Sequence, residues 1–471
     1  MCSISGFIRW GESFNHEVAT KVLVGILRRS AERGNDSFGV VAVQADGTTR
    51  EYKEVSPQGY AAIASIIDAN TVSVIANNRA EPTTEWVENK SLRDVQPFGY
   101  MSKKTVLQPG AIWVTHNGTI ANDKELAKEF KLHRTTQIDS AVIPPLVDVL
   151  GVRDAISALI GSYALAVVRS DFPNRLWLAT NYKPLFTQLT DSTLWFGSHP
   201  SYVQPQGGPR HQMASYPIVP VEPYTMWCID ATQHRIEYID LEPRGEKKKA
   251  LVICSGGLDS VTTAAWAKEQ GYEITLLHFT YNCRAQEREI QAVREVAVSL
   301  ECKYRFEDLA WLGALGGNPL VDTAMPIARG DSGAEFAHEW VPARNMVFIA
   351  LAAALCDRYE FDTLFLGLNL EEGGAYPDNT VAFVDAMDHA CNIGTKSRPR
   401  ILSPLANKVK HEIVKLGLSL DAPLEHSYSC YHEDGHCRGD SSTFCGPCRM
   451  RYVAFQMNGI SDGVIREQYM R

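Results

Sequence analysis

A short charged segment divides the chain into two regions whose hydrophobic patterns differ. Residues 243–249 contain a proline, a glycine and five charged side chains, a combination that interrupts helices and strands alike. Upstream, the apolar runs are short and rich in β-branched residues, whereas downstream they alternate between the lengths of strands and helices. Because 471 residues exceed the usual size of one domain, the sequence predicts a two-domain α/β protein with domains at residues 1–243 and 249–471.

The downstream region has the pattern of a doubly wound domain. The expected strands are 250–254, 273–279 and 363–366, and the expected helices are 261–270, 285–300 and 345–359. Alternation of strands with helices is typical of a parallel sheet that helices cover on both faces.

The upstream region is predicted to be rich in strands, with few helices. Its apolar runs are no longer than a typical strand, and several of them alternate or are β-branched. The expected strands are 39–43, 72–76, 111–115, 163–168, 176–179 and 194–197.

Composition and charge restrict the classes of function. The longest nearly uninterrupted apolar stretch, residues 347–356, is much shorter than the ~20 residues of a membrane-spanning helix. The N-terminus lacks a basic segment followed by an apolar core, and the 11 cysteines are spread along a long chain, so a cytoplasmic protein with reduced thiols and no membrane partner is expected. The net charge of −9 gives no general attraction to nucleic acid. A small-molecule substrate is favoured, and the basic run at Arg244 and residues 247–249 is interpreted as a solvated linker.

Cys2 directly follows the initiator methionine, and removal of Met1 would expose an α-amine beside its thiol. An α-amine titrates near pH 8, so it can take the thiol proton directly or through water without a histidine. The pair is a candidate nucleophile with its own base.

Several segments behind Cys2 resemble the class II glutamine amidotransferases. The start Met-Cys-Ser-Ile-Ser-Gly-Phe is similar to theirs, although a glycine commonly stands at Ser3, and residues 33–39 resemble their early glycine-bearing loop. The resemblance covers about residues 1–205 and implies an αββα sandwich of the N-terminal-nucleophile (Ntn) hydrolases. It also implies that Arg79 holds the carboxylate of glutamine, that Asp139 pairs with its ammonium group, and that Asn117 and Gly118 stabilise the oxyanion.

A glycine-bearing turn lies between the first downstream strand and helix. Its residues are Ser255, Gly256, Gly257, Leu258, Asp259 and Ser260. Free backbone N–H groups at a helix N-terminus suit an anion. The hexapeptide resembles the pyrophosphate loop of the N-type ATP pyrophosphatases, which implies ATP as cosubstrate and Mg²⁺ to screen the phosphates. It lacks the lysine of a Walker A loop, so transfer of the γ-phosphate is not expected.

The remaining downstream motifs resemble the 7-cyano-7-deazaguanine synthases. These motifs are Val341-Pro-Ala-Arg-Asn345, Tyr376-Pro-Asp378, Ser403-Pro-Leu405 and Ser429-Cys-Tyr431. The resemblance covers about residues 249–465, although Asn379 stands where the synthases commonly have cysteine. It implies a 7-deazaguanine substrate whose candidate contacts are Tyr281, Arg284, Arg344, Asn345, Tyr376 and Asp378. Arg344 and Asp378 have an alternative interpretation as structural ion-pair partners.

A cysteine cluster near the C-terminus predicts a structural zinc site. Cys430, Cys437, Cys445 and Cys448 would supply four thiolates, the donor set of a closed tetrahedral site. The synthases place three of these cysteines in tandem, and this chain has Ser442 at the first position, so Cys437 must substitute, with His436 as a rival ligand.

These motifs predict an amidotransferase in which Cys2 releases ammonia from glutamine into an internal channel that leads to the C-terminal domain. The acceptor would be the 7-substituent of a 7-deazaguanine, with either a carboxylate converted to the nitrile or a nitrile converted to the formamidine of archaeosine-type tRNA or phage DNA modification. Whether the acceptor is a free base or a base in nucleic acid stays open, and a homo-oligomer is expected. The alternatives are an asparagine-synthetase-like enzyme, disfavoured by the cysteine cluster, and a vestigial nucleic-acid-binding protein.

Overall fold

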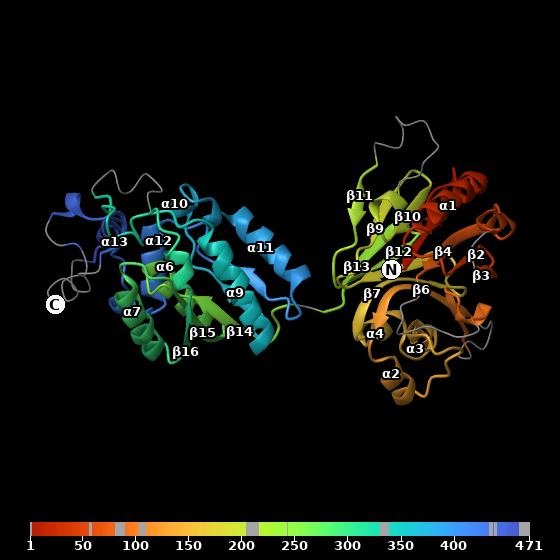
Figure 1. The fold of residues 1–471 in the computed structure, drawn as a ribbon, viewed down its shortest axis with the longest axis horizontal. Helices are drawn as coiled ribbons and strands as arrows, with labels where there is room; N and C mark the ends of the chain where they lie inside the picture. The colour runs from red at the N-terminus through yellow and green to blue at the C-terminus, as the bar shows by residue number, and fades with distance from the viewer. Residues whose placement is uncertain are drawn as a thin grey trace. The chain divides into compact units, whose positions relative to one another are not determined.

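The computed structural model describes residues 2–55, 59–80, 90–102, 110–203, 216–242, 244–329, 339–432, 437 and 440–460. The chain forms two compact units, Met1–Pro243 and Arg244–Arg471, which Figure 1 shows in red to yellow-green and in green to blue. Each unit has its own hydrophobic cores.

The N-terminal unit consists of two antiparallel sheets and their covering helices. The first sheet has the order β11-β9-β10-β1-β4-β2-β3, and the second has the order β13-β12-β8-β7-β6-β5. The strands are β1 (Ser3–Arg9), β2 (Ser37–Gln44), β3 (Thr49–Glu54), β4 (Thr71–Arg79), β5 (Phe98–Met101), β6 (Ala111–Ile120), β7 (Gly161–Arg169), β8 (Arg175–Thr180), β9 (Phe186–Leu189), β10 (Thr193–Gly197), β11 (Ile218–Pro220), β12 (Thr225–Asp230) and β13 (Arg235–Asp240). The helices are α1 (His16–Ser30), α2 (Asp123–Glu129), α3 (Ile143–Leu150) and α4 (Val152–Ser157).

Strand β1 shows why the unit has four layers. Its side chains alternate between the two faces of the first sheet, so Ile4 and Ile8 join the core between the sheets while Phe7 joins the core beneath α1. On the far side of the second sheet, Leu146 of α3 packs with Val114 of β6 in a third core. The result is the predicted αββα sandwich.

The C-terminal unit is built on a parallel five-stranded sheet with the order β16-β15-β14-β17-β18. The strands are β14 (Lys249–Ile253), β15 (Glu273–Thr280), β16 (Lys303–Asp308), β17 (Thr363–Phe365) and β18 (Arg400–Leu402). The helices are α6 (Leu258–Glu269), α7 (Gln286–Ser299), α8 (Ala310–Gly313), α9 (Arg344–Tyr359), α10 (Leu370–Gly373), α11 (Val381–Gly394), α12 (Lys410–Ser419) and α13 (Gly446–Met457). One core packs α6, α7, α12 and α13 on one face, and a second core packs α9 and α11 on the other, which confirms the doubly wound prediction.

The strand order reverses beside β14, because β14 pairs with β15 on one side and with β17 on the other. The loops that leave the carboxyl ends of β14 and β17 therefore diverge towards opposite faces of the sheet. In doubly wound folds, ligands bind in the crevice that this divergence opens.

The predicted strands and helices all occur, with different ends. The helix predicted at residues 261–270 begins at Leu258, because Gly257 already occupies the N-cap. The strand predicted at residues 111–115 continues to Ile120, and α11, α12 and α13 were not predicted.

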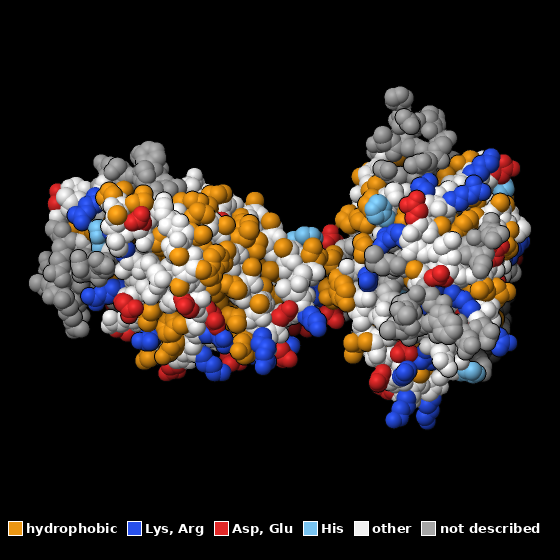
Figure 2. Space-filling view, viewed as in Figure 1, with side chains coloured by type: hydrophobic (Ala, Val, Ile, Leu, Met, Phe, Trp, Pro, Cys, Tyr) orange, Lys and Arg blue, Asp and Glu red, His pale blue; other side chains and the backbone are white. Residues whose placement is uncertain are grey.

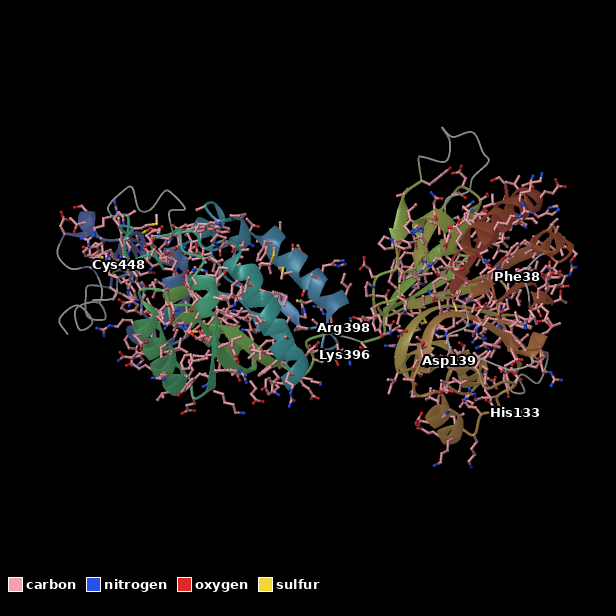
Figure 3. All side chains as sticks on the ribbon, in the orientation of Figure 1. Phe38, His133, Asp139, Lys396, Arg398 and Cys448 are labelled. Carbon is pink, nitrogen blue, oxygen red and sulfur yellow. The ribbon has the colours of Figure 1, made fainter. Side chains whose placement is uncertain are left out.

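The basic run after the first unit makes contacts within the second. Arg244 donates to both oxygens of Asp388, at 2.8 and 3.0 Å, and to the carbonyl of Arg398 at 2.8 Å, near the residues labelled Lys396 and Arg398 in Figure 3. The ammonium groups of Lys248 and Lys249 donate to the carbonyls of Gln270 and Tyr359. Arg244 is thus held within the second unit, whereas Lys247 and Lys248 are exposed, as a solvated linker predicts.

Figure 2 shows hydrophobic side chains on the outer face of α9 and α11, where Met346, Leu351, Val381 and Ile393 are exposed. The apolar stretch predicted from the sequence forms part of α9, which has 16 residues. Within the described ranges, the helices are all too short or too polar to cross a bilayer.

Candidate active sites and cysteine cluster

Cys2 lies at the start of β1, in the middle of the first sheet. Ser3 pairs with Asn78 of β4, which places Cys2 beside the end of β4. The thiol of Cys2 lies 3.4 Å from the carbonyl oxygen of Ala80, and the residue is partly buried. The predicted nucleophile therefore stands next to Arg79.

Arg79 ends β4 and is only 1% exposed. Its Nη1 donates to the carbonyl of Asp94 at 3.3 Å. Burial alone would raise the pKa of Asp94, but hydrogen bonds from Thr136 and Ser91, with a smaller effect of Arg79, hold it below its usual value. The backbone carbonyl of Asp94 thus helps to fix the buried guanidinium of Arg79.

The segment His116-Asn117-Gly118 lies in β6 and is tied to both sheets. Asn77 of β4 donates its side-chain amide to the His116 carbonyl at 3.2 Å, which joins the first sheet to the second. Asn117 is 5% exposed. Gly118 has φ +150°, and a Cβ there would lie 1.9 Å from the carbonyl oxygen of Ser162, so only glycine fits between β6 and β7.

Asp139, labelled in Figure 3, is held by hydrogen bonds within its own unit. Its Oδ2 accepts from the backbone N–H of Ile120 at 2.6 Å, and its Oδ1 accepts from the Ser140 hydroxyl at 2.8 Å. Nδ1 of His116 lies 2.6 Å from the same hydroxyl, and burial lowers the pKa of His116 despite the nearby Asp139. Asp139 and Asn117 are therefore linked through Ser140 and His116.

In the C-terminal unit, the predicted pyrophosphate loop joins β14 to α6. Gly256 has φ +79°, a left-handed conformation, and its carbonyl accepts from the backbone N–H of Tyr428 at 2.8 Å. Gly257 is the N-cap of α6, and its N–H lies 3.3 Å from the Ser255 hydroxyl. The first N–H groups of α6 have no acceptor inside the helix, so they are available to an anion.

Asp259 forms a buried ion pair with Lys410 at the start of α12. The Asp259 Oδ2 lies 2.6 Å from Lys410 Nζ and 2.8 Å from Asn369 Nδ2, while Glu372 lies 3.4 Å from the same Nζ. Burial opposes a charged lysine, but the two carboxylates raise the pKa of Lys410. Lys410 is therefore charged and contacts both acids, while burial raises the pKa of Asp259 despite the nearby ammonium group.

Four of the predicted substrate contacts line one cavity with this loop at the carboxyl ends of β14 and β17. They are Tyr281, Arg284, Arg344 and Asn345. Tyr376 and Asp378 line a smaller adjoining cavity that shares Arg344 with the first.

The contacts of these residues fall into two groups. Arg344 donates to the Tyr281 hydroxyl at 3.3 Å, and the backbone N–H of Asn345 donates to Asp378 at 3.1 Å. Arg284 instead donates to the carbonyls of Asp322 and Met325, at 2.6 and 2.5 Å. Arg284 therefore binds the segment from Asp322 to Met325.

Several cavity residues were not predicted from the sequence: His278, Glu289, Glu372 and Lys410. Of these, Lys410 could have been noticed in the sequence. It stands at the first position of a helix, where a negative charge is usually preferred. The others come from segments far apart in the chain.

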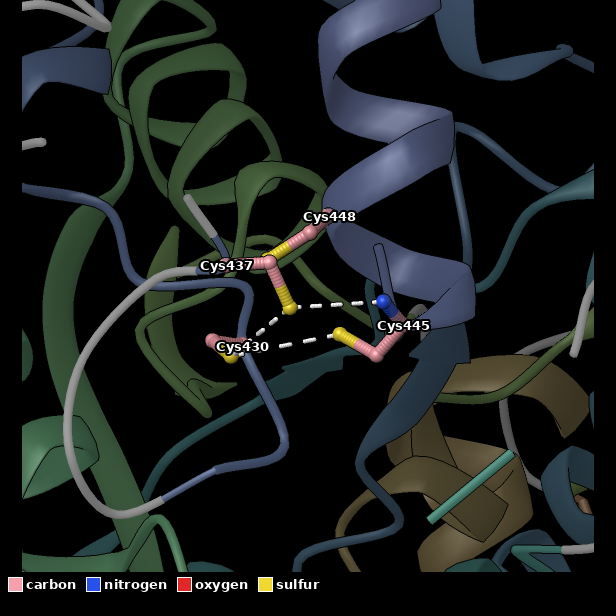
Figure 4. A group of neighbouring side chains, drawn as sticks. All are labelled: Cys430, Cys437, Cys445 and Cys448. Atoms are coloured by element: carbon pink, nitrogen blue, oxygen red, sulfur yellow. Dashed lines mark hydrogen bonds between the residues drawn. The ribbon is translucent and has the colours of Figure 1, made fainter. Parts of the chain in front are cut away.

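The four predicted cysteines form one cluster, shown in Figure 4, and all four sulfurs lie within 4.8 Å of one another. Cys430 Sγ lies 3.9 Å from the sulfurs of Cys437 and Cys445. With Zn–S bonds of about 2.3 Å, the sulfurs of a tetrahedral site lie about 3.8 Å apart. The donor set and its spacing therefore fit zinc.

Cys437 takes the fourth place in the cluster, and Ser442 does not. The Ser442 hydroxyl donates to Asp440 at 2.6 Å. The rival ligand His436 lies outside the described residues.

Arg451 of α13 fastens the cluster segment to the sheet domain. It is 1% exposed, and its Nη1 donates to the Ser427 hydroxyl at 2.8 Å and the Ser429 hydroxyl at 3.2 Å. Phe455, one turn further along α13, lies in the core with α6 and α7. The cluster thus lies beside Tyr428 and Ser429, which line the cavity.

The family model of the queuosine biosynthesis protein QueC matches residues 249–459, and a model described as a glutamine amidotransferase domain matches residues 91–205. A 7-cyano-7-deazaguanine synthase of Sulfolobus acidocaldarius is 38% identical over 98% of this chain and 99% of its own length. The chain belongs to the 7-cyano-7-deazaguanine synthase family. Another family member, 7-cyano-7-deazaguanine synthase 2 of Sulfurisphaera tokodaii, is 39% identical over the same shares of both chains.

Not every synthase of the family has this length. The 7-cyano-7-deazaguanine synthase of Nitratiruptor sp. is 37% identical to this chain. The match spans 97% of that synthase but only 46% of this chain. Among solved structures, a glutamine phosphoribosylpyrophosphate amidotransferase from B. subtilis is 14% identical, with a TM-score of 0.39 over 95% of each chain. The two family models show that this chain combines a glutamine amidotransferase domain with a synthase domain.

Replacing Gly256 by alanine tests how tightly the loop is built. The new Cβ would meet Ala292 Cβ at 2.8 Å, and the left-handed φ would be strained. We expect the free energy of unfolding to fall by about 1–3 kcal/mol, measured by urea denaturation. Gly316→Ala is the matched control, because Gly316 has φ +63° and nothing within 4 Å of its Cβ position. Equal losses in the two variants would show that contact with Ala292 does not constrain the loop.

Proposed function

We propose that this chain is a glutamine-dependent synthase that converts the 7-carboxylate of a free 7-deazaguanine base into the nitrile, with ATP. The glycine-bearing loop at the cavity carries this proposal. Forming a nitrile from a carboxylate requires the carbonyl oxygens to be activated, and an anion-binding helix terminus suits the pyrophosphate that adenylation releases.

In the N-terminal unit, the thiol of Cys2 attacks the amide carbon of glutamine. The α-amine exposed by removal of Met1 takes the thiol proton and returns it to the departing ammonia. Arg79 binds the glutamine carboxylate and Asp139 its ammonium group. Asn117 and the Gly118 N–H stabilise the oxyanion, and water then hydrolyses the thioester to glutamate.

In the C-terminal unit, the carboxylate attacks the α-phosphate of ATP, which releases pyrophosphate and gives an acyl adenylate. Ammonia from the first unit displaces AMP to form the amide. The amide oxygen is adenylated by a second ATP, and loss of AMP gives the nitrile. The residues that contact the base are Tyr281, Arg344, Asn345, Tyr376 and Asp378. Arg284 instead binds the carbonyls of Asp322 and Met325.

Mg²⁺ fits the loop because one buried carboxylate oxygen of the loop lacks a hydrogen-bond partner. Among the described residues, Oδ1 of Asp259 has no hydrogen-bond partner, and hard carboxylate oxygens are the ligands that Mg²⁺ prefers. Asp259 would hold the ion, which would screen the phosphate charge as pyrophosphate leaves.

The rival functions have less support. The family assignment and the four-cysteine cluster disfavour an asparagine synthetase. Conversion of a nitrile to the formamidine needs no net ATP, so the intact loop from Ser255 to Ser260 favours nitrile synthesis. The contacts of Arg244 within the second unit and the net charge of −9 disfavour the nucleic-acid-binding hypothesis. A cytoplasmic location, an ammonia channel and a homo-oligomer remain predictions from the sequence.

Replacing Cys2 by alanine should separate the two activities. We expect glutamine-dependent nitrile formation from 7-carboxy-7-deazaguanine to fall at least a hundredfold, because the nucleophile is lost. Formation supported by ammonium salts should stay within about twofold of the wild type. Product mass and pyrophosphate release measure both reactions. Cys228→Ala, which removes a partly buried thiol from β12, is the control. Undiminished glutamine use by the Cys2→Ala variant would contradict the proposal.

Zinc content tests the cysteine cluster. We expect about one zinc per chain by plasma emission spectroscopy, since four thiolates complete a closed site. Cys448→Ser should lose the metal and lower the unfolding temperature of the C-terminal unit, because metal binding contributes directly to folding. Cys302→Ser, at a partly buried cysteine outside the cluster, should keep the metal. A zinc-free wild type of full stability would rule out the site.

A further inference from the structure

Nitrile synthesis releases protons that some group must accept. Ammonia carries three N–H protons and a nitrile nitrogen carries none. One proton leaves when ammonia displaces AMP, the second when the amide oxygen is adenylated, and the third when AMP leaves to form the nitrile. Each loss comes from the same nitrogen, so a base beside the reacting carbon could serve all three steps.

Most acidic groups of the cavity are already engaged. Asp259 and Glu372 share the charge of Lys410, at 2.6 and 3.4 Å. Tyr281 accepts a hydrogen bond from Arg344, and burial raises the pKa of this phenol. These contacts favour fixed protonation states, which is the opposite of what a base requires.

Glu289 of α7 differs from these groups. It lines the cavity, and its side chain is 19% exposed. The thiol of Cys283 donates weakly to its Oε2 at 3.7 Å, and His278 Nε2 lies 3.9 Å from the same oxygen. In the part of the chain that the structure describes, no lysine or arginine nitrogen comes within 4.0 Å of this carboxylate. Burial raises the pKa of Glu289 to about 7, against a smaller opposing effect of Arg344.

Nε2 of His278, in β15, lies near the carboxyl group of Glu289. Its Nδ1 lies 2.9 Å from the Cys254 carbonyl, which only accepts, so Nδ1 carries the ring proton and Nε2 has the lone pair. This Nε2 is without a hydrogen-bond partner among the described residues, and the ring is 3% exposed. Burial lowers the pKa of His278, so the ring stays neutral and a protonated Glu289 can donate to it.

We propose that Glu289 is the general base that takes the protons of the attacking nitrogen during amide and nitrile formation, with His278 as the positioning residue whose neutral ring presents Nε2 to the carboxyl group. This inference rests on the proposed function. In each step the carboxylate gains the proton that the nitrogen loses. AMP leaves the reacting carbon when the amide and the nitrile form, and pyrophosphate leaves the α-phosphorus of ATP when the amide oxygen is adenylated. The proton then passes to water through the cavity.

The test replaces Glu289 by glutamine in the full chain and supplies ammonium salts, so that the glutaminase reaction is bypassed. Exchange between ATP and pyrophosphate, driven by 7-carboxy-7-deazaguanine without ammonia, moves no N–H proton and should stay within about threefold of the wild type. Nitrile formation should fall by about 10²–10⁴-fold. Glu289→Asp should recover part of the rate, and Glu287→Gln, at an exposed residue of the same helix, should match the wild type.

The dependence on pH gives a second readout. With free NH₃ held constant, the wild-type rate should rise as pH increases through about 7, because the carboxylate is the active form. The glutamine variant should lose this rise. The titratable and charged groups near Glu289 are Cys283, His278, Arg344, Tyr281 and Cys254. Arg344 stays charged throughout, and burial raises the pKa of the Tyr281 phenol and of both thiols.

The outcomes distinguish the base from the function it rests on. A wild type that exchanges pyrophosphate but makes no nitrile would overturn both proposals. An active wild type whose Glu289→Gln variant loses exchange and nitrile formation equally would assign Glu289 to binding and overturn its role as base. An unchanged pH profile in that variant would do the same.

Discussion

The synthase site depends on a buried charge arrangement that joins three segments of the C-terminal unit. Asp259 lies in the first turn of α6, Glu372 in α10, and Lys410 begins α12. The ammonium group contacts both carboxylates. Removing the lysine would leave two buried acids without a counterion, which costs several kcal/mol in proteins, about 3–5 when one partner of a buried pair is lost. The arrangement fixes the start of α6 and with it the N–H groups that face the cavity.

Strand pairing sets the geometry of the proposed glutaminase site. Cys2 is fixed by the position of β1 between β10 and β4, and the bond from Asn77 to the His116 carbonyl sets the second sheet beside it. An N-terminal cysteine needs no histidine base, so His116 can remain buried and neutral. Under the proposed function, two reactions that share one nitrogen would be carried by two units of a single chain, each with its own hydrophobic cores.

The sequence was sufficient for the features that are local. The loop at Ser255, the cysteine cluster and the predicted strands rest on short spacings and periodicity, and the structure contains each of them. Lys410 and Glu289 were missed because their importance arises from contacts across the fold, such as the 151 residues between Asp259 and Lys410. The motif around Arg284 could not predict that its guanidinium binds the carbonyls of Asp322 and Met325, because these residues lie far from it in the chain.

The most direct measurement follows the nitrogen itself. The purified chain is incubated with glutamine labelled with ¹⁵N in the amide group, ATP and 7-carboxy-7-deazaguanine, and the product is analysed by mass. The account predicts a nitrile that carries the label, with two pyrophosphates released for each nitrile. An unreactive acid, together with a labelled formamidine formed from added 7-cyano-7-deazaguanine without pyrophosphate, would contradict it.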